Sequence, residues 1–280
     1  MRPRLSFRLT MCRARFAVPC AVLALFLMPS AVNAGAWPQP KNKLQLISTF
    51  TFTEASSHYG PNGDEVDYGR FEKHEWRLYG EYGWRDSTTF VGEAALAHDV
   101  SDSAGRLTVN RGWKELKAGA QIRLFEVSQR RMVMGVRPLA IFHLARESDD
   151  PTASEGADMD LRLDVTLGRG ADPQAPLKLF YDLAIGYVWR AGERLDEMRL
   201  DATVGGYLTP KLMALVHSRI ELSNPAESAY EDGYERRKLD LDLVREMSPA
   251  LSFAVGGTWT YDGRNTAAER GVNLALWYRF

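Results

Sequence analysis

The sequence predicts an all-β chain that closes into an antiparallel transmembrane β-barrel of about twelve strands. Three observations support this fold class. The amino end has an export signal, the following segments alternate between apolar and polar residues, and no long apolar helix follows residue 34. Inside lipid, only helices and closed barrels satisfy every backbone hydrogen-bonding group. An exported membrane chain without such a helix must therefore close into a barrel.

Residues 1–34 have the pattern of a secretory signal peptide. Five arginines and no acid surround the start, an apolar run follows at 16–28, and Val32 and Ala34 suit a signal-peptidase site. The apolar run is shorter than the roughly 20 residues that a helix needs to cross a bilayer. We expect cleavage after Ala34, which leaves residues 35–280 as a single barrel domain.

Alternation of apolar and polar residues identifies the strands, as where Leu161, Leu163 and Val165 alternate with Arg162 and Asp164. Each run is near or above the roughly 9–11 residues that a tilted membrane strand requires. The expected strands are 43–53, 70–83, 88–100, 111–126, 131–145, 158–168, 177–190, 194–208, 211–222, 235–247, 251–261 and 272–280.

The connections between these strands alternate in length. Long polar loops are expected at 54–69, 101–110, 146–157 and 223–234, and short turns at 84–87, 127–130, 209–210 and 248–250. The turn at 191–193 is short where the alternation requires a long loop. Pro138 lies inside an expected strand and cannot donate a ladder hydrogen bond, so we expect a bulge or local break at 137–139.

Outward-facing aromatic residues lie near both ends of the strands, which predicts the two aromatic girdles of a membrane barrel. One group comprises Phe50, Phe52, Phe142, Tyr187, Trp189, Trp259 and Tyr261, and the other comprises Tyr82, Phe90, Phe253, Tyr278 and Phe280.

The chain ends on a strand with one continuous apolar face, formed by Val272, Leu274, Leu276, Tyr278 and Phe280. An ordinary edge strand of a soluble sandwich would show the same alternation. The ending closely resembles the last strand of bacterial outer-membrane β-barrel proteins, where the terminal aromatic and its alternating partners form the signal read by the barrel-assembly machinery. The resemblance implies an outer-membrane location, termini in the periplasm, and contacts with outer-membrane lipid and lipopolysaccharide.

A second resemblance rests on Gly35-Ala36-Trp37 and on residues 79–83. These motifs are similar to uncharacterised outer-membrane barrels associated with exopolysaccharide or biofilm genes. The similarity implies a role alongside partner proteins and assigns no functional residue.

The net charge and the positions of the cysteines limit which kinds of exported protein the sequence fits. The signal removes five arginines from a chain whose formal net charge is already −1, which argues against a nucleic-acid partner. Cys12 and Cys20, the two cysteines of the chain, both lie in the signal. A secreted soluble domain of this size would often contain disulfides, whereas outer-membrane barrels as a family are poor in cysteine.

Charged residues at inward positions predict a polar lumen, because so many charges facing lipid would be prohibitive. The expected lumen-lining residues are Lys73, Glu75, Arg77, Glu93, Lys117, Arg123, Arg137, Arg162, Asp164, Asp182, Arg199, Asp201, His217, Arg219, Asp240 and Asp242. Basic and acidic residues are nearly balanced. Two arrangements stay open at this point: a water-filled, weakly ion-selective pore, or pairing across the lumen that closes it.

No catalytic, metal-binding or cofactor motif is evident. Outer-membrane lipid hydrolases typically have a His-x-Ser pair on one strand, and none of the five histidines has a serine two residues later. His217 and Ser218 are adjacent and face opposite sides of their strand, although a pair drawn from different strands stays possible. The sequence therefore predicts a passive channel or transporter for small solutes. The alternatives are a structural or secretion-accessory envelope barrel and, less favoured, a lipid hydrolase.

Overall fold

The structure is a computed structural model, and it describes residues 36–103, 106–145, 147–148, 158–175, 178–192, 194–223 and 233–280. The expected signal peptide and its cleavage bond lie outside the described residues. So do most of the expected loops 146–157 and 223–234.

Twelve long strands form one antiparallel sheet, as the alternation predicted, and two strands of two residues extend it. The strands are β1 (Leu44–Tyr59), β2 (Glu65–Arg85), β3 (Thr88–Ser103), β4 (Arg106–Val127), β5 (Met132–His143), β6 (Glu147–Ser148), β7 (Asp158–Arg169), β8 (Leu179–Trp189), β9 (Glu197–Thr209), β10 (Leu212–Ser223), β11 (Glu235–Ser248), β12 (Leu251–Arg264), β13 (Thr266–Ala267) and β14 (Arg270–Arg279). One turn of 3-10 helix, η1 (Ser128–Arg130), joins β4 to β5. No helix among the described residues is long and apolar enough to cross a membrane.

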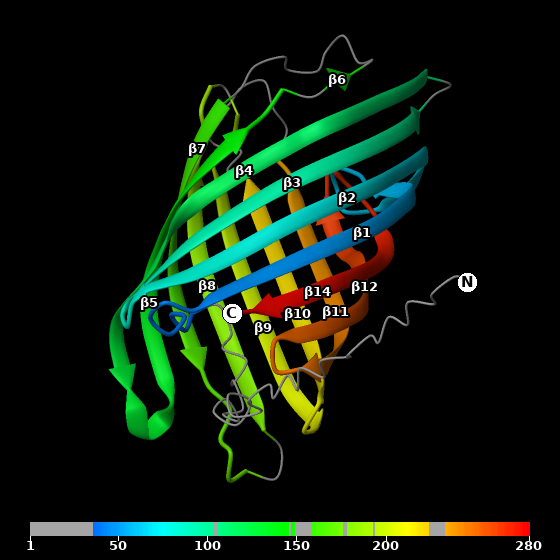
Figure 1. Cartoon of the computed structure of the whole chain (residues 1–280). Helices are drawn as coiled ribbons and strands as arrows, with labels where there is room; N and C mark the ends of the chain where they lie inside the picture. Colours follow the sequence, from blue (N-terminus) through cyan, green and yellow to red (C-terminus); the bar gives the residue numbers. More distant parts are fainter. Residues whose placement is uncertain are drawn as a thin grey trace, which may run out of the picture. The chain divides into compact units, whose positions relative to one another are not determined.

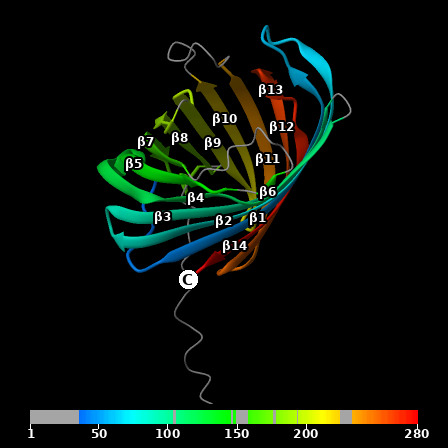
Figure 2. The same ribbon diagram turned by 90° about the horizontal axis from the view of Figure 1, so that it is seen from above.

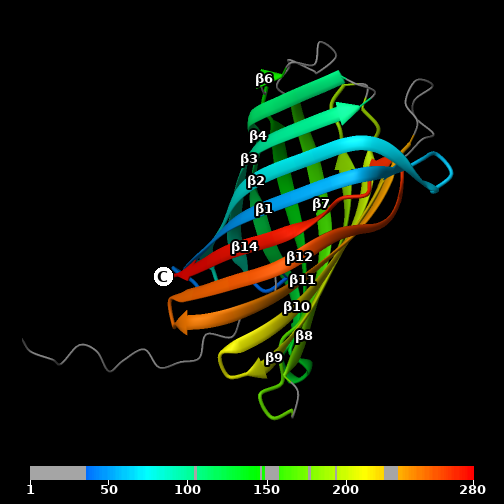
Figure 3. The ribbon, with the colours of Figure 1, turned by 90° about the vertical axis from the view of Figure 1, so that its right-hand side faces the viewer.

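The sheet closes on itself because β1 pairs with both the second and the last strand. Phe50 of β1 lies opposite Trp76 of β2 on one side and opposite Leu274 of β14 on the other. Figure 2 shows the strands arranged as a ring, and Figure 3 shows β14 between β1 and β12. The predicted closed twelve-stranded barrel is therefore confirmed.

Several strands continue beyond the predicted ends. The expected loop at 54–69 is wrong, because β1 and β2 pair up to Tyr59 and Glu65 and only a tight turn at 60–64 joins them. The expected loop at 101–110 is wrong for the same reason, because β3 and β4 pair up to Ser103 and Arg106. Most side chains in these stretches are polar, so the sequence shows no apolar–polar alternation there. The backbone hydrogen bonds between the strands form regardless of side-chain polarity.

Pro138 interrupts pairing on one side only. Towards β7 the register is unbroken, with Pro138 opposite Leu163. Towards β4, the pairing of residues is interrupted between Leu139, which is opposite Gly119, and Val136, which is opposite Ile122. The register is the same on both sides of the gap. The predicted break is present on the β4 side, where the missing N–H would have donated, and there is no bulge at this position.

The two faces of the sheet differ as the alternation predicted. Exposed apolar side chains cover the outer face, whereas the inner face holds buried polar ones: Leu161 is 50% exposed and Val165 46%, but Asp164 between them is fully buried. A soluble protein would bury the apolar face. A barrel that exposes it over many strands is built for contact with lipid.

The barrel has two distinct ends (Figure 1). We call the end that holds Leu44 and Phe280 the terminal end and the opposite one the distal end. Exposed aromatic side chains lie near both: Tyr82, Phe90, Phe253, Tyr278 and Phe280 near the terminal end, and Phe50, Phe142, Trp189 and Tyr261 towards the distal end. Phe52, Tyr187 and Trp259 are only half-buried.

Candidate functional site: the barrel interior

The interior wall holds most of the charged residues that the sequence analysis assigned to a lumen. Glu75, Arg162 and Asp240 are at most 8% exposed, and Asp164 is completely buried. A buried charge is costly unless it is paired and hydrogen-bonded. The geometry of the interior is therefore determined by how these charges meet.

Asp164 is the centre of one charge network, on β5, β7 and β9. Arg137 donates to it from Nε at 2.9 Å and lies within 2.7 Å through Nη2. Arg162 donates from Nε at 2.6 Å, and its Nη2 donates to Asp201 at 2.6 Å. This network crosses β8 at Gly186, where a Cβ would overlap the Asp164 carboxylate. Glycine leaves the necessary space.

A second network covers β2, β3 and β4, with Arg77 at its centre. Its guanidinium pairs with Glu75 at 2.6 Å, with Glu115 at 3.3 Å, and with Glu93. The Nζ of Lys117 lies 2.9 Å from Glu93 and 3.0 Å from Glu115. Arg77 and Lys117 both pair with Glu93 and Glu115, so ion pairs connect the neighbouring strands of this wall.

A third group of charged residues lies on β9, β10 and β11, and its cations around Asp240 are more exposed. The Nη2 of Arg219 donates to Asp240 at 2.7 Å, and Nδ1 of His217 lies 3.7 Å from the same carboxylate oxygen. Arg199 pairs with Glu197 on its own strand. The side chains of His217 and Arg219 are 34% and 38% exposed, against 8% for Arg162. This side of the interior is therefore better solvated than the side around Asp164.

Glu269, which the sequence analysis did not identify, pairs with lysines from two separate strands at the distal end. It lies between β13 and β14 and is within 3.0 Å of Lys73 Nζ on β2 and 2.7 Å of Lys238 Nζ on β11. Thr53 donates to it at 3.2 Å. Burial alone would raise the pKa of Glu269, but Lys238 and Lys73 outweigh burial and hold it well below its ordinary value.

Three predicted lumen residues have other surroundings. Arg123 pairs with Glu126 near η1 and is the last position of β4 before a bulge. Asp242 lies against Gly256 of the neighbouring strand. Asp182 accepts a hydrogen bond from the backbone N–H of Ala36 at 2.5 Å, a contact between residues far apart in the chain.

That contact belongs to residues 36–40, which we call the inward segment. The backbone N–H of Gln39 donates to Thr89 at 2.7 Å, and its side-chain amide donates to Glu81 at 2.5 Å. Gln121 contributes a longer hydrogen bond to the carbonyl of Ala36 at 3.5 Å. Thr89, Glu81 and Gln121 are buried on inward positions of their strands, so the inward segment lies inside the barrel.

The inward segment spans the interior from one wall to the other. It begins beside Asp182 on β8 and leads into β1, and β8 is six positions from β1 in the ring of twelve long strands. Ala36 is fully buried, and a Cβ on Gly168 would lie 2.8 Å from the Cβ of Ala36 and 3.2 Å from Cδ1 of Trp37. Gly168 thus provides space on the wall for the start of the segment.

Apolar side chains fill the other half of the terminal end. Phe180, Met213, Val244, Ala254 and Ala275 form a buried cluster, against which Ile47, Ala171, Tyr207, Leu215 and Trp277 pack. These strands run from β8 to β1 through β14, on the side away from most contacts of the inward segment. The segment and the cluster together narrow the terminal end.

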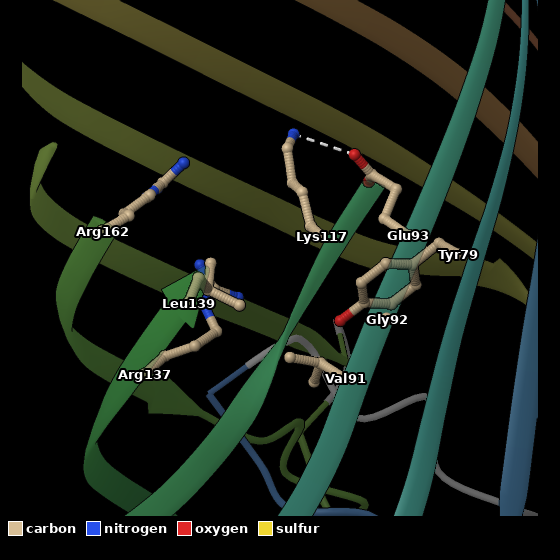
Figure 4. A pocket seen from close by; sticks show the side chains of 8 residues that line it. All are labelled: Tyr79, Val91, Gly92, Glu93, Lys117, Arg137, Leu139 and Arg162. Atoms are coloured by element: carbon tan, nitrogen blue, oxygen red, sulfur yellow. Dashed lines mark hydrogen bonds and ion pairs between the residues drawn. The ribbon is translucent and has the colours of Figure 1, made fainter. Parts of the chain in front are cut away.

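A cavity of about 120 Å³ lies along the interior wall over β2 to β7. Figure 4 shows its lining, in which Lys117, Arg137 and Arg162 extend from three strands towards one space beside Tyr79 and Glu93.

Two of the described histidines, His143 and His217, face carboxylates, whereas the ring of His74 contacts those of Phe52 and His98. His143 Nε2 lies 2.7 Å from Asp160, which also pairs with Arg194 at 2.6 Å. His217 faces Asp240. No described serine hydrogen-bonds to either of these two rings, and the described residues contain no group of three His, Cys, Asp or Glu placed to hold a metal ion.

Comparison with solved structures identifies the architecture. A crystal structure of the COG4313 outer membrane channel from Pseudomonas putida F1 aligns with a TM-score of 0.62 and 13% identity, covering 89% of this chain and all of that one. The NanC porin aligns with a TM-score of 0.50 and 11% identity, covering 84% of this chain and 98% of the porin. The transport unit of the autotransporter AIDA-I from Escherichia coli also has a TM-score of 0.50 at 10% identity, covering 92% and 94%.

No protein-family model and no curated protein sequence matches the chain. The structural likeness at these identities concerns the fold, and the exposed apolar face independently requires a lipid environment. The chain has the fold of bacterial outer-membrane β-barrel proteins, a porin-like barrel of twelve strands.

Proposed function

We propose that the protein is a passive outer-membrane channel for small hydrophilic solutes. The observation that carries this proposal is the interior wall, which is lined with charged groups yet retains a cavity among them. A twelve-stranded barrel is wider than the eight-stranded size that side chains just fill. The solvated side at His217 and Arg219 is the natural place for a continuous water path.

The terminal end faces the periplasm in this proposal, and the inward segment limits the flow there. Outer-membrane barrels have short periplasmic turns and long external loops. The turns after β2, β9 and β11 at the terminal end are two residues long, whereas β8 and β9 are joined at the distal end by residues 190–196. The inward segment contacts the wall through a few hydrogen bonds, so its release would widen the path.

A reversible crosslink tests both parts of the proposal. Residues 35–280 contain no cysteine, and the N–H of Gln39 lies 2.7 Å from the hydroxyl of Thr89, so Gln39→Cys with Thr89→Cys introduces two cysteines at residues that are already in contact. In planar bilayers, we expect low single-channel conductance when the pair is oxidised and higher conductance after reduction. The single variant Thr89→Cys controls for the reductant and should respond to neither treatment.

The competing function is a structural or secretion-accessory envelope barrel. The charge networks favour it specifically, because carboxylates such as Asp164 and Glu269 each bind two cations and brace neighbouring strands. A folded protein without conductance in either redox state would support this alternative. Conductance that the crosslink does not change would retain the channel but remove the inward segment from its control.

A further inference from the structure

We infer that the cavity over β2 to β7 is a binding subsite for a small oxyanion, a carboxylate or phosphate group carried by the permeating solute. The inference rests on the proposed channel function and assigns it a substrate class. It is carried by the three cationic side chains around the cavity, by the way they are held, and by the hydrogen bonds that connect Tyr79 of its lining to the inward segment through Glu81.

The lining of the cavity is predominantly cationic. Lys117, Arg137 and Arg162 line it together with a single carboxylate, that of Glu93. Asp164, which neutralises both arginines, is completely buried behind them. A solute in the cavity therefore meets more positive than negative groups, although the interior as a whole is nearly balanced.

The cations are held in position before any ligand arrives. Arg137 binds Asp164 through Nε and Nη2, and Arg162 binds Asp164 and Asp201 through the same two nitrogens. No hydrogen bond joins Nη1 of either arginine to a described residue. The planar fork of a guanidinium matches the two oxygens of a carboxylate or phosphate. Side chains already fixed by other contacts lose little conformational entropy when they bind a ligand.

The cavity also connects to the inward segment. Tyr79 lines the cavity, and its hydroxyl donates to Oε1 of Glu81 at 2.6 Å. The other oxygen, Oε2, accepts from Gln39 of the inward segment at 2.5 Å. An anion in the cavity would therefore lie beside Tyr79, which donates to the carboxylate that holds the inward segment. At about 120 Å³, the cavity has room for an oxyanion group but not for a large solute.

Calorimetric titration of the refolded barrel in non-ionic detergent tests the inference directly. The probes are inorganic phosphate and acetate, with glucose as the neutral control. We expect saturable binding of one phosphate per barrel, weaker binding of acetate, and none of glucose. Absence of saturable phosphate or acetate binding at low salt would overturn the inference.

Paired variants locate the site. Lys117→Gln and Arg137→Lys each remove a cavity contact, and we expect phosphate binding to weaken about tenfold, since charge-assisted hydrogen bonds contribute roughly that much. Lys73→Gln and Arg219→Lys alter cations with comparable carboxylate partners outside the cavity, and should leave binding within about twofold. Equal losses in all four variants would indicate general electrostatic attraction and contradict a discrete site. Lys117→Gln is the decisive variant if Arg137→Lys does not fold, because Arg77 still pairs with Glu93 and Glu115.

Conductance and phosphate binding, measured on the same protein preparations, test the channel and the subsite independently. Conductance in planar bilayers without phosphate binding would overturn the subsite and leave the channel. Binding that the cavity variants weaken, in a barrel that does not conduct, would support the subsite and overturn the channel.

Discussion

Replacing Asp164 by Asn tests whether the interior is as tightly packed as the structure shows. Asp164 is fully buried and accepts from Arg162 through Oδ1 and from Arg137 through Oδ2. Asparagine has nearly the same shape but only one acceptor oxygen. Its NH₂ group must face one of the two guanidinium groups, donor against donor, and the charge that balances both arginines is lost.

The expected cost follows from this geometry. Removing one partner from a buried, hydrogen-bonded ion pair typically costs about 3–5 kcal/mol, and Asp164 is the only carboxylate paired with Arg137 among the described residues. We therefore expect Asp164→Asn to lower the free energy of unfolding by about 3–5 kcal/mol. The measurement is equilibrium unfolding in urea from lipid vesicles, followed by tryptophan fluorescence.

A matched control separates burial from simple pairing. Glu147 accepts two hydrogen bonds from Arg111, each 2.8 Å, but these side chains are 69% and 62% exposed. Glu147→Gln should leave the free energy of unfolding nearly unchanged, because water already screens this pair. Equal and small losses in both variants would refute the reasoning, because they would mean that water reaches Asp164 and screens its charge.

Further predictions concern the lipid face, assembly and acid stability. Leu163→Arg places a charge on the outward face of β7 and should cost about 2–4 kcal/mol in the same unfolding assay; a cost near zero would mean that the assigned faces are reversed. Deletion of Phe280 should reduce the heat-modifiable, folded barrel in the outer-membrane fraction while export continues, and normal levels would contradict its role in assembly. The lowered pKa of Glu269 means that its pairs with Lys73 and Lys238 contribute stability above the ordinary carboxyl pKa, and that this contribution disappears as the pH falls through the pKa of the folded state. Glu269→Gln should therefore lose less stability than wild type on acidification from neutral pH, and parallel losses would exclude this role.

Local pattern alone was enough to predict the strands and their faces. The period of two in β7 and β14 reports directly which side chains face lipid, because neighbouring residues of a strand must point to opposite sides. Leu163 and Arg162 are on opposite faces for that reason. The prediction failed where the pattern loses contrast, in the polar extensions of β1 and β2 and of β3 and β4.

The sequence could not predict which charged side chains form ion pairs with one another. Alternation places Arg162, Asp164 and Asp201 on the inner face but does not indicate that two of them meet across β8. That contact depends on the order and stagger of the strands and on the space left at Gly186. Glu269 follows no strand pattern at all, and only closure of the ring brings it between Lys73 and Lys238.

The inward segment shows this division most clearly. The sequence alone excludes a strand at Pro38 and Pro40, which follow Trp37, because proline cannot donate to a ladder. Only the tertiary structure decided where they lie. Ala36 contacts Asp182, 146 residues further along the chain, and does so because twelve strands return β8 to the side of the ring opposite β1. A local pattern determines which way a side chain points, whereas closure of the barrel determines what it meets.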